Sequence, residues 1–139
     1  MIVLDTNVIS ALMRPAVNPE VVSWLDRESS SAIWITAISV LEIRSGLLLL
    51  PDGRRKSDLL ERFDLFLDDA IAGRVLPFDR NAAEAASSLS ARRIAIGRNI
   101  DALDTQIAGV AISRRAALAT RNVKDFNDID VPLINPWPD

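Results

Sequence analysis

The sequence predicts an α/β fold: a three-layer α/β/α sandwich around a central, mostly parallel sheet of four to five strands. Short apolar runs alternate with helical patterns along the whole chain, as expected when helices cover both faces of a parallel sheet. The first run, Ile2-Val3-Leu4, has no polar residue and is typical of a central strand buried on both sides. Because the 139 residues contain no repeat, linker or low-complexity tract, we expect a single domain over residues 1–139.

Each expected element is supported by its pattern and its ends. In chain order, we expect a strand at residues 2–4, helices at 8–13 and 19–27, a strand at 32–35, helices at 37–50 and 54–72, a strand at 74–78, helices at 80–96 and 101–114, a strand at 117–120 and a weak edge strand at 131–134. The strands are apolar or β-branched runs, and most helices carry apolar residues three or four apart. Four helices begin at residues whose side chains can cap free backbone N–H groups: Asn18, Thr36, Asp79 and Asp101.

The composition narrows the possible chemistry. The chain contains no cysteine and no histidine, which excludes disulfides, thiolate metal sites, cysteine nucleophiles and the commonest general base. Any hydrolysis must therefore use carboxylates, hydroxyls, amides and a bound metal ion. No apolar stretch reaches the roughly 18 residues that a membrane span needs, and the N-terminus lacks a signal-peptide pattern, so we expect a cytoplasmic protein.

The junction after the first strand carries the strongest functional signal. Asp5 follows the strand directly, and Thr6 and Asn7 open the next helical pattern. Ligands of open α/β sheets bind outside the carboxyl ends of the strands, so we expect Asp5 to face that crevice. A carboxylate there is partly stripped of water and needs a cation or hydrogen-bond donors. The alternative is that Asp5 or Thr6 caps the helix.

Three further acids occupy positions where a helix would place them near a crevice. Glu42 lies two turns into its helix, in a stripe with Ser39 and Gly46 and among apolar neighbours, although a solvated glutamate is the alternative. Asp101 and Asp104 share one face in the first turn of their helix. Asp101 fits an N-cap well, whereas Asp104 fits the reciprocal capping position poorly, because glutamate or glutamine is usual there.

The fourth expected strand ends as the first one does. Thr120-Arg121-Asn122 leaves this strand as Asp5-Thr6-Asn7 leaves the first, so we expect Asn122 at the same crevice. Asp125 follows, and a turn through residues 123–124 could return its carboxylate to the site. Alternatively, Asp125 could cap a short turn that begins at Phe126.

Clustered carboxylates without histidine or cysteine are hard oxygen ligands, which suit Mg²⁺ or Mn²⁺. Such ions can ionise a bound water and stabilise the attacking and leaving oxygens of a phosphodiester. The net charge is −3, but 14 of the 16 basic residues are arginines, whose guanidinium groups suit phosphates. Solvated helix faces remain the simpler explanation for any single arginine pair.

With these residues placed, the sequence resembles a PIN domain, in particular the VapC and FitB-like toxins of bacterial toxin–antitoxin pairs. Four segments carry the resemblance and come in the family's order: VLDTNVIS at residues 3–10, ISVLEIRSG at 38–46, LDTQIAGVA at 103–111 and LATRNVKDF at 118–126. The resemblance implies a ribonuclease that uses Mg²⁺ or Mn²⁺. It also implies a homodimer and a cognate antitoxin whose tail occludes the site.

The resemblance assigns roles to individual residues. Asp5, Glu42 and Asp104 match the family's three acids and would be the metal ligands. The family's supporting polar residues correspond to Thr6, Asn7 and Thr120 in this chain. Where the family often has a fourth acid, this chain has Asn122, with Asp125 just beyond. For contact with RNA we select the arginines nearest to these positions in sequence, Arg44, Arg98 and Arg121.

Two other functions are weighed against a ribonuclease. A haloacid-dehalogenase-like phosphatase would use a strand-end aspartate as nucleophile, but it needs a second acid where this chain has Asn7, and a lysine where only Lys56 and Lys124 are available. A non-enzymatic interaction module would use its acids as caps and bind partners through the leucine run at residues 47–50. That run also fits a homodimer interface, or burial beneath the following helix.

Overall fold

The computed structural model describes residues 1–138. Within them, five strands form one sheet: β1 (Ile2–Leu4), β2 (Ile33–Thr36), β3 (Val75–Leu76), β4 (Ala117–Ala119) and β5 (Leu133–Ile134). The strand order is β3-β2-β1-β4-β5, and every neighbouring pair is parallel. The predicted α/β class and parallel sheet are therefore confirmed.

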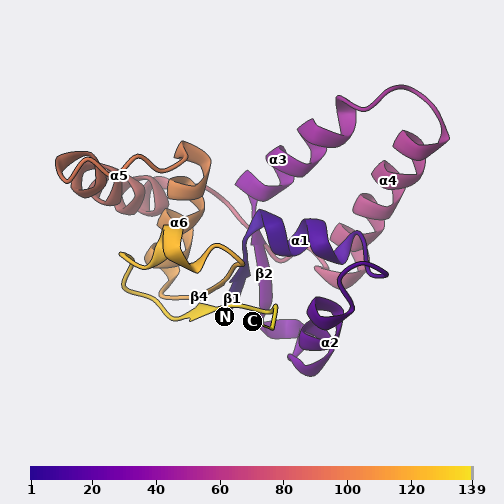
Figure 1. Cartoon of the computed structure of the whole chain (residues 1–139), viewed down its shortest axis with the longest axis horizontal. Helices are drawn as coiled ribbons and strands as arrows, with labels where there is room; N and C mark the ends of the chain where they lie inside the picture. Colours follow the sequence, from indigo (N-terminus) through magenta and orange to yellow (C-terminus); the bar gives the residue numbers. More distant parts are fainter. Residues whose placement is uncertain (139) are drawn as a thin grey trace.

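Helices cover both faces of this sheet (Figure 1). They are α1 (Thr6–Leu12), α2 (Pro19–Arg27), α3 (Ala37–Leu48), α4 (Arg54–Leu65), α5 (Arg80–Ala95) and α6 (Ala102–Arg114), with short helical turns η1 (Ser30–Ala32), η2 (Phe66–Ala70) and η3 (Val123–Phe126). Val3 points to the core shared with α5 and α6, whereas Leu4 points to the core shared with α1, α2 and α4. Helix α3 contributes Ile38 to the first core and Ile43 to the second, and it forms with α4 the hairpin at the upper right of Figure 1.

The topology puts a switch point beside β1, the place where ligand crevices of open α/β sheets form. The chain builds β1, β2 and β3 outward on one side, then returns so that β4 pairs with the other side of β1. Connections that depart in opposite directions leave a gap outside the carboxyl ends of the two strands. Leu4 pairs with Ala119, and the Asp5 amide donates to the Ala119 carbonyl at 2.8 Å. Asp5 and Thr120 therefore leave their strands side by side at this switch point.

Two elements differ from the sequence prediction for clear physical reasons. The helix expected over residues 54–72 ends as α4 at Leu65 and continues as the π-helical turn η2, with the Ile71 amide bonded to the Phe66 carbonyl at 2.9 Å. Phe63, Leu67 and Ile71 are spaced by four residues, so a wider turn keeps all three facing the core. The strand expected at 74–78 shrinks to β3, because Pro77 has no N–H to extend the ladder.

Three of the expected helix caps are confirmed, and the fourth is wrong. Thr36, Asp79 and Asp101 accept backbone N–H groups at the starts of α3, α5 and α6. Asn18 makes no side-chain cap bond; its amide donates to the carbonyls of Ala11 and Arg14 and its oxygen accepts from the Trp137 indole, 3.3 Å away. Asn18 instead ties the loop between α1 and α2 to the end of the chain.

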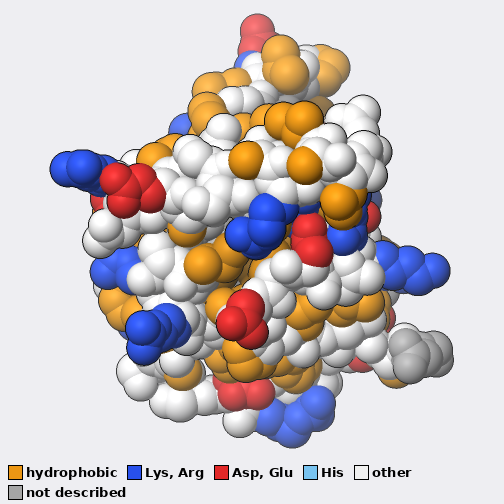
Figure 2. Space-filling model, turned by 90° about the vertical axis from the view of Figure 1, so that its left-hand side faces the viewer, with side chains coloured by type: hydrophobic (Ala, Val, Ile, Leu, Met, Phe, Trp, Pro, Cys, Tyr) orange, Lys and Arg blue, Asp and Glu red, His pale blue; other side chains and the backbone are white. Residues whose placement is uncertain are grey.

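Helices α5 and α6 pack unusually closely. A Cβ on Gly109 of α6 would lie 2.6 Å from the carbonyl oxygen of Ala82 and 2.7 Å from the Cβ of Ala86, both on α5. Only glycine fits there, so the backbones of the two helices meet directly. Figure 2 looks onto this side of the molecule, where hydrophobic side chains lie among scattered charges. Over residues 1–138, the helices are too short or too polar for any of them to cross a membrane.

Candidate active site

Asp5 is the most buried acid at the switch point. Its side chain is 2% exposed. One carboxylate oxygen accepts from the Thr6 amide and the other from the Thr120 hydroxyl, both at 2.8 Å. Asp5 therefore does cap α1, but its second oxygen belongs to a separate interaction across the crevice. Burial raises the pKa of Asp5 above 3.8, and the charges of Glu42 and Asp125 raise it further, whereas the two hydrogen bonds lower it.

Thr6 connects the first strand's end to Glu42. The Thr6 hydroxyl donates to Glu42 Oε1 at 2.8 Å, and it also lies 2.8 Å from the Ser39 hydroxyl. Because a carboxylate only accepts hydrogen bonds, the Thr6 hydroxyl donates to Glu42, and the Ser39 hydroxyl must donate to the Thr6 oxygen. Ser39 is fully buried and its amide is fixed by the Thr36 cap at 3.1 Å. This chain of hydroxyls explains the stripe of Ser39 and Glu42 on α3.

Asp104 lies half-buried in the first turn of α6, opposite these residues. Asp101 is the cap: its carboxylate accepts the amides of Leu103 and Asp104 at 2.8 and 3.3 Å. Burial raises the pKa of Asp104 from 3.8 to about 6, with further contributions from the charges of Asp5, Asp101, Glu42 and Asp125. The charges of Asp5, Glu42 and Asp125 thus act on Asp104 in the same direction as its burial.

The end of β4 supplies amides and hydroxyls. Thr120, besides donating to Asp5, accepts from the Asn122 amide at 3.0 Å and from the Asn7 side chain at 3.4 Å. Asn7 also accepts from the Arg121 amide at 3.4 Å, so the turn after β1 and the turn after β4 are bonded together. The Asn122 side chain is exposed, and Asp125 lies half-buried inside η3. A cap on a turn that begins at Phe126 is therefore not what Asp125 forms.

The residues present fit a divalent cation. Among residues 1–138, neither arginine nor lysine forms an ion pair with Asp5, Glu42, Asp104 or Asp125. A buried carboxylate surrounded by like charges is costly unless a cation compensates it. The same described residues contain no three acidic side chains close enough to grip a bare ion together. An ion bound here would therefore keep several of its waters and take at most two of these carboxylates directly, as Mg²⁺ does.

The three arginines selected for RNA contact all have partners within the chain. Arg44 pairs with Asp64 and stacks over the Phe63 ring at 5.5 Å. Arg98 contacts the Lys124 carbonyl and pairs with Asp128 at 3.4 Å. Arg121 stacks over the Trp137 ring at 4.9 Å without an acidic partner in the described chain. Of the three, Arg121 is the one whose charge is available beside Asn122.

Sequence reasoning missed a buried ion pair, Arg93 and Asp128, that contacts the segments carrying Asp104 and Asp125. Arg93 is 2% exposed and forms a bidentate pair with Asp128. The doublet Arg92-Arg93 has the appearance of a solvated helix face. Its only hint of burial is the position of Arg93 four residues after Leu89, which lies in the core.

Comparison with known proteins identifies the family of this chain. A family profile described as PIN domain matches residues 2–132. The chain belongs to the PIN-domain family. It is 40% identical over 139 residues to Toxin FitB of Neisseria gonorrhoeae, covering the whole of both chains. It is also 37% identical over 137 residues to VapC ribonuclease Y4jK of Sinorhizobium fredii, covering 99% of this chain and 98% of the relative.

Solved structures of this PIN-domain family share the fold. The crystal structure of FitAcB from Neisseria gonorrhoeae superposes with a TM-score of 0.89 at 39% identity, covering 99% of each chain. A chain of FitAB bound to an IR36 DNA fragment superposes with a TM-score of 0.90 at 39% identity, covering 99% of this chain and 96% of that one. The α/β/α sandwich expected from the resemblance is thus the observed one.

Proposed function

We propose that this chain is a metal-dependent ribonuclease that acts as the toxin of a toxin–antitoxin pair. One observation carries the proposal: Asp5 is a buried carboxylate at the switch point, without a basic partner in residues 1–138, and its charge interacts with those of Glu42 and Asp104. The similarity to Toxin FitB and to a VapC ribonuclease over nearly the whole chain supports the same activity.

The residues of the crevice would have two roles: some would bind the metal ion, and others would orient the metal-binding side chains. Asp5, Glu42 and Asp104 would hold Mg²⁺ or Mn²⁺, one or two of them directly and the rest through the ion's waters, and the ion would supply Lewis acidity for hydrolysis of a phosphodiester. Thr120 and Thr6 fix the orientation of Asp5 and Glu42 through their 2.8 Å hydrogen bonds. The Asn122 amide is too weak a ligand to draw in a second cation, so Asp125 is our candidate for the fourth acid.

The partners follow from the same family relationship. Relatives occur in complexes called FitAcB and FitAB, the latter bound to DNA, and we propose that a cognate antitoxin likewise binds and neutralises this chain. We also propose a homodimer acting on cytoplasmic RNA. Leu48 and Leu49 at the end of α3 are 53% and 86% exposed, whereas Leu47 packs against the core, so only part of the leucine run is buried. These leucines are available for a partner or a second copy, and light scattering at about tens of micromolar distinguishes a dimer from a monomer.

RNA-end mapping tests the activity. The chain is induced in cells, and the 5′ ends of total RNA are compared with those after induction of Asp5→Asn. New ends that depend on Asp5, together with in vitro cleavage that EDTA stops and Mn²⁺ restores, support the proposal. Hydrolysis of phosphate monoesters without RNA cleavage would favour the phosphatase alternative, and the absence of both would favour an interaction module.

A further inference from the structure

Arg93 is a buried cation that the proposed mechanism does not use. It lies near the end of α5 with 2% of its surface exposed. A guanidinium is retained in such a place only when its charge and its N–H groups are satisfied, because an unpaired buried charge is strongly destabilising. The partners that satisfy Arg93 are therefore informative about its role.

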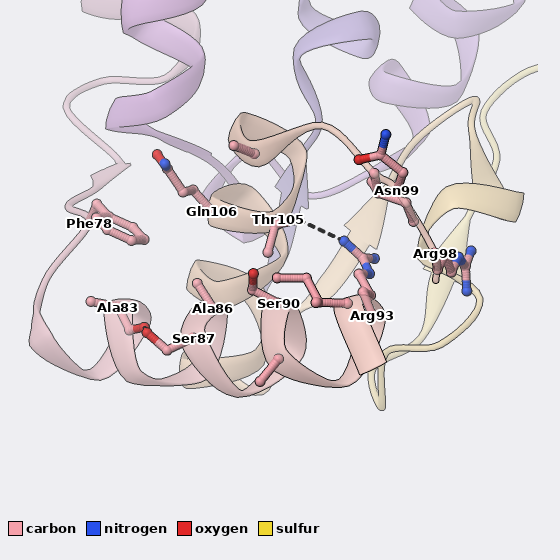
Figure 3. A pocket seen from close by; sticks show the side chains of 14 residues that line it. Phe78, Ala83, Ala86, Ser87, Ser90, Arg93, Arg98, Asn99, Thr105 and Gln106 are labelled. Carbon is pink, nitrogen blue, oxygen red and sulfur yellow. Dashed lines mark hydrogen bonds between the residues drawn. The ribbon is translucent and has the colours of Figure 1, made fainter. Parts of the chain in front are cut away.

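Arg93 contacts three segments of the chain. Its Nε and Nη2 donate to the two carboxylate oxygens of Asp128 at 2.8 and 3.0 Å. Its Nη1 donates to the Thr105 hydroxyl at 2.8 Å, the bond drawn as a dashed line in Figure 3. Its Nη2 also donates to the backbone carbonyl of Asp125 at 2.8 Å. The Arg93 hydrogen bond lowers the pKa of Asp128, so the pair is ionised at neutral pH.

Two of these contacts lie at or next to a candidate metal ligand. Thr105 follows Asp104 in sequence, and its hydroxyl donates to the Asp101 carbonyl at 3.2 Å, which fixes the first turn of α6. The carbonyl that Arg93 holds is that of Asp125 itself. Arg93 thus fixes the backbone next to Asp104 and Asp125. Its positive charge is paired with Asp128 and not with either of these two candidate ligands.

This division matters because the acids repel one another. Asp104 and Asp125 come from different segments, α6 and η3, and nothing in their own charges keeps them at one crevice without a cation. An arginine paired directly with them would hold them together but would occupy the place of the ion. Arg93 instead binds the Thr105 hydroxyl and the Asp125 backbone carbonyl, and it leaves the carboxylate oxygens of Asp104 and Asp125 free.

We propose that Arg93 and Asp128 form a positioning pair that holds Asp104 and Asp125 at one crevice, so that both can serve the divalent cation bound at Asp5. The inference rests on the proposed metal-dependent function. It assigns to the C-terminal part of α5 a role in metal affinity, although none of its residues contacts the ion.

Isothermal titration with Mn²⁺ on the full chain tests the proposal. Arg93→Lys keeps the charge but loses the planar fork, and Asp128→Asn keeps the shape but loses the charge. Residues that orient metal ligands typically change metal affinity by about 10–100-fold, and we expect Kd for Mn²⁺ to rise within that range in both variants. Thr105→Val should raise Kd by a smaller factor, and Thr105→Ser, which keeps the hydroxyl, should restore the wild-type value.

Two controls separate positioning from general stability. Arg114 pairs with Asp79 at 3.3 Å and joins α5 and α6 at their other ends, so Arg114→Lys should leave Kd unchanged. Val110→Ala removes a buried side chain from α6 without touching the Arg93 contacts, so it should lower the melting temperature and leave Kd unchanged.

The outcomes are distinct. Folded Arg93→Lys and Asp128→Asn proteins with wild-type Kd would overturn the positioning role, and so would an equal loss of affinity in Val110→Ala. If those two variants do not fold, the comparison of Thr105→Val with Thr105→Ser decides in the same way. A wild-type chain that binds no Mn²⁺ and cleaves no RNA would overturn the proposed function itself, whereas wild-type binding that the variants retain removes only this inference.

Discussion

Replacing Asp104 with asparagine should stabilise the metal-free protein at neutral pH. The pKa of Asp104 is raised in the folded state, so its ionised form is the one that costs free energy. Below about pH 3.8 the carboxyl is protonated in both folded and unfolded states, and the penalty is absent. It grows as the pH rises from 3.8 to about 6 and stays constant above that value.

The size of the effect follows from the pKa and the surroundings. Raising the pKa from 3.8 to about 6 corresponds to about 3 kcal/mol, at about 1.36 kcal/mol for each pKa unit. Asp104 is only half-buried, so water screens a large part of this penalty. The N-terminus of α6 also favours a negative charge by about 0.3–1 kcal/mol. The net gain expected for Asp104→Asn is about 1 kcal/mol, or about 3–5 °C in Tm.

Urea unfolding in EDTA measures this gain at about pH 4.5 and pH 8, with tryptophan fluorescence as the probe. The gain should be present at the higher pH and largely lost at the lower one. Asp101→Asn is the matched control, because it neutralises an acid in the same turn while asparagine still caps the helix. A variant that is less stable at pH 8, or a gain equal at both pH values, would show that Asp104 acts through packing or capping.

The same unfolding experiment in the presence of Mn²⁺ should favour the wild type over Asp104→Asn. Any ligand that binds only the folded state stabilises it, by about 2.7 kcal/mol at a concentration 100 times its Kd. Saturating Mn²⁺ should therefore stabilise the wild type by more than it stabilises Asp104→Asn. If both proteins respond equally to Mn²⁺, Asp104 is not a ligand.

Three further outcomes are expected. Asp5→Asn should abolish RNA cleavage while leaving Tm equal or higher, because it neutralises a buried anion and asparagine can still cap α1; circular dichroism measures the melt, and a large drop would mean that the ionised carboxylate stabilises the fold. Asp125→Ala should weaken Mn²⁺ binding in calorimetry while Asn122→Asp tightens it, and an unchanged Kd for Asp125→Ala would remove that residue from the site. Arg121→Gln should reduce the slope of log affinity for single-stranded RNA against log salt by about 0.7 in filter binding, since one phosphate contact is lost; an unaltered slope would leave Arg121 as a partner of Trp137 only.

The sheet was predictable because its strands are short and buried on both faces. Ile2-Val3-Leu4 has no polar residue, and the structure places Val3 and Leu4 in the two cores on opposite faces of the sheet. The lengths of the edge strands were not predictable from apolar runs alone. A strand at the edge pairs on one side only, and Pro77 ends β3 after two residues.

The position of Asp5 beside Thr120 was predictable because topology brings strand ends together. Asp5 and Thr120 each follow a strand directly, and parallel neighbours end at the same edge. Glu42 needed the further guess that its stripe on α3 faces inward, and its bond from Thr6 is consistent with that guess. The close packing of α5 and α6 was not foreseen, because no periodicity indicates that the hydrogen of Gly109 is the only side group that fits.

Arg93 marks the limit of sequence reasoning here. Arg92 and Arg93 are chemically identical neighbours, yet the first is exposed and the second is buried. The difference depends on Asp128, which is 35 residues away and has no pattern that links it to α5. A long-range pair of this kind is set by how helix and loop meet, and local spacing carries no record of it.

The distribution of charge in the folded chain gives the arginines and the acids different tasks. Arg93 and Arg98 form ion pairs with Asp128 and donate hydrogen bonds to the backbone carbonyls of residues 124–125. Arg44 forms an ion pair with Asp64. Asp5 and Glu42 receive hydrogen bonds from neutral hydroxyls and an amide instead. Neutral donors orient a carboxylate without cancelling its charge, so the crevice keeps a negative field that only an external cation can balance. The same field repels phosphate, and a cation that neutralises it would therefore govern the approach of RNA as well as its hydrolysis.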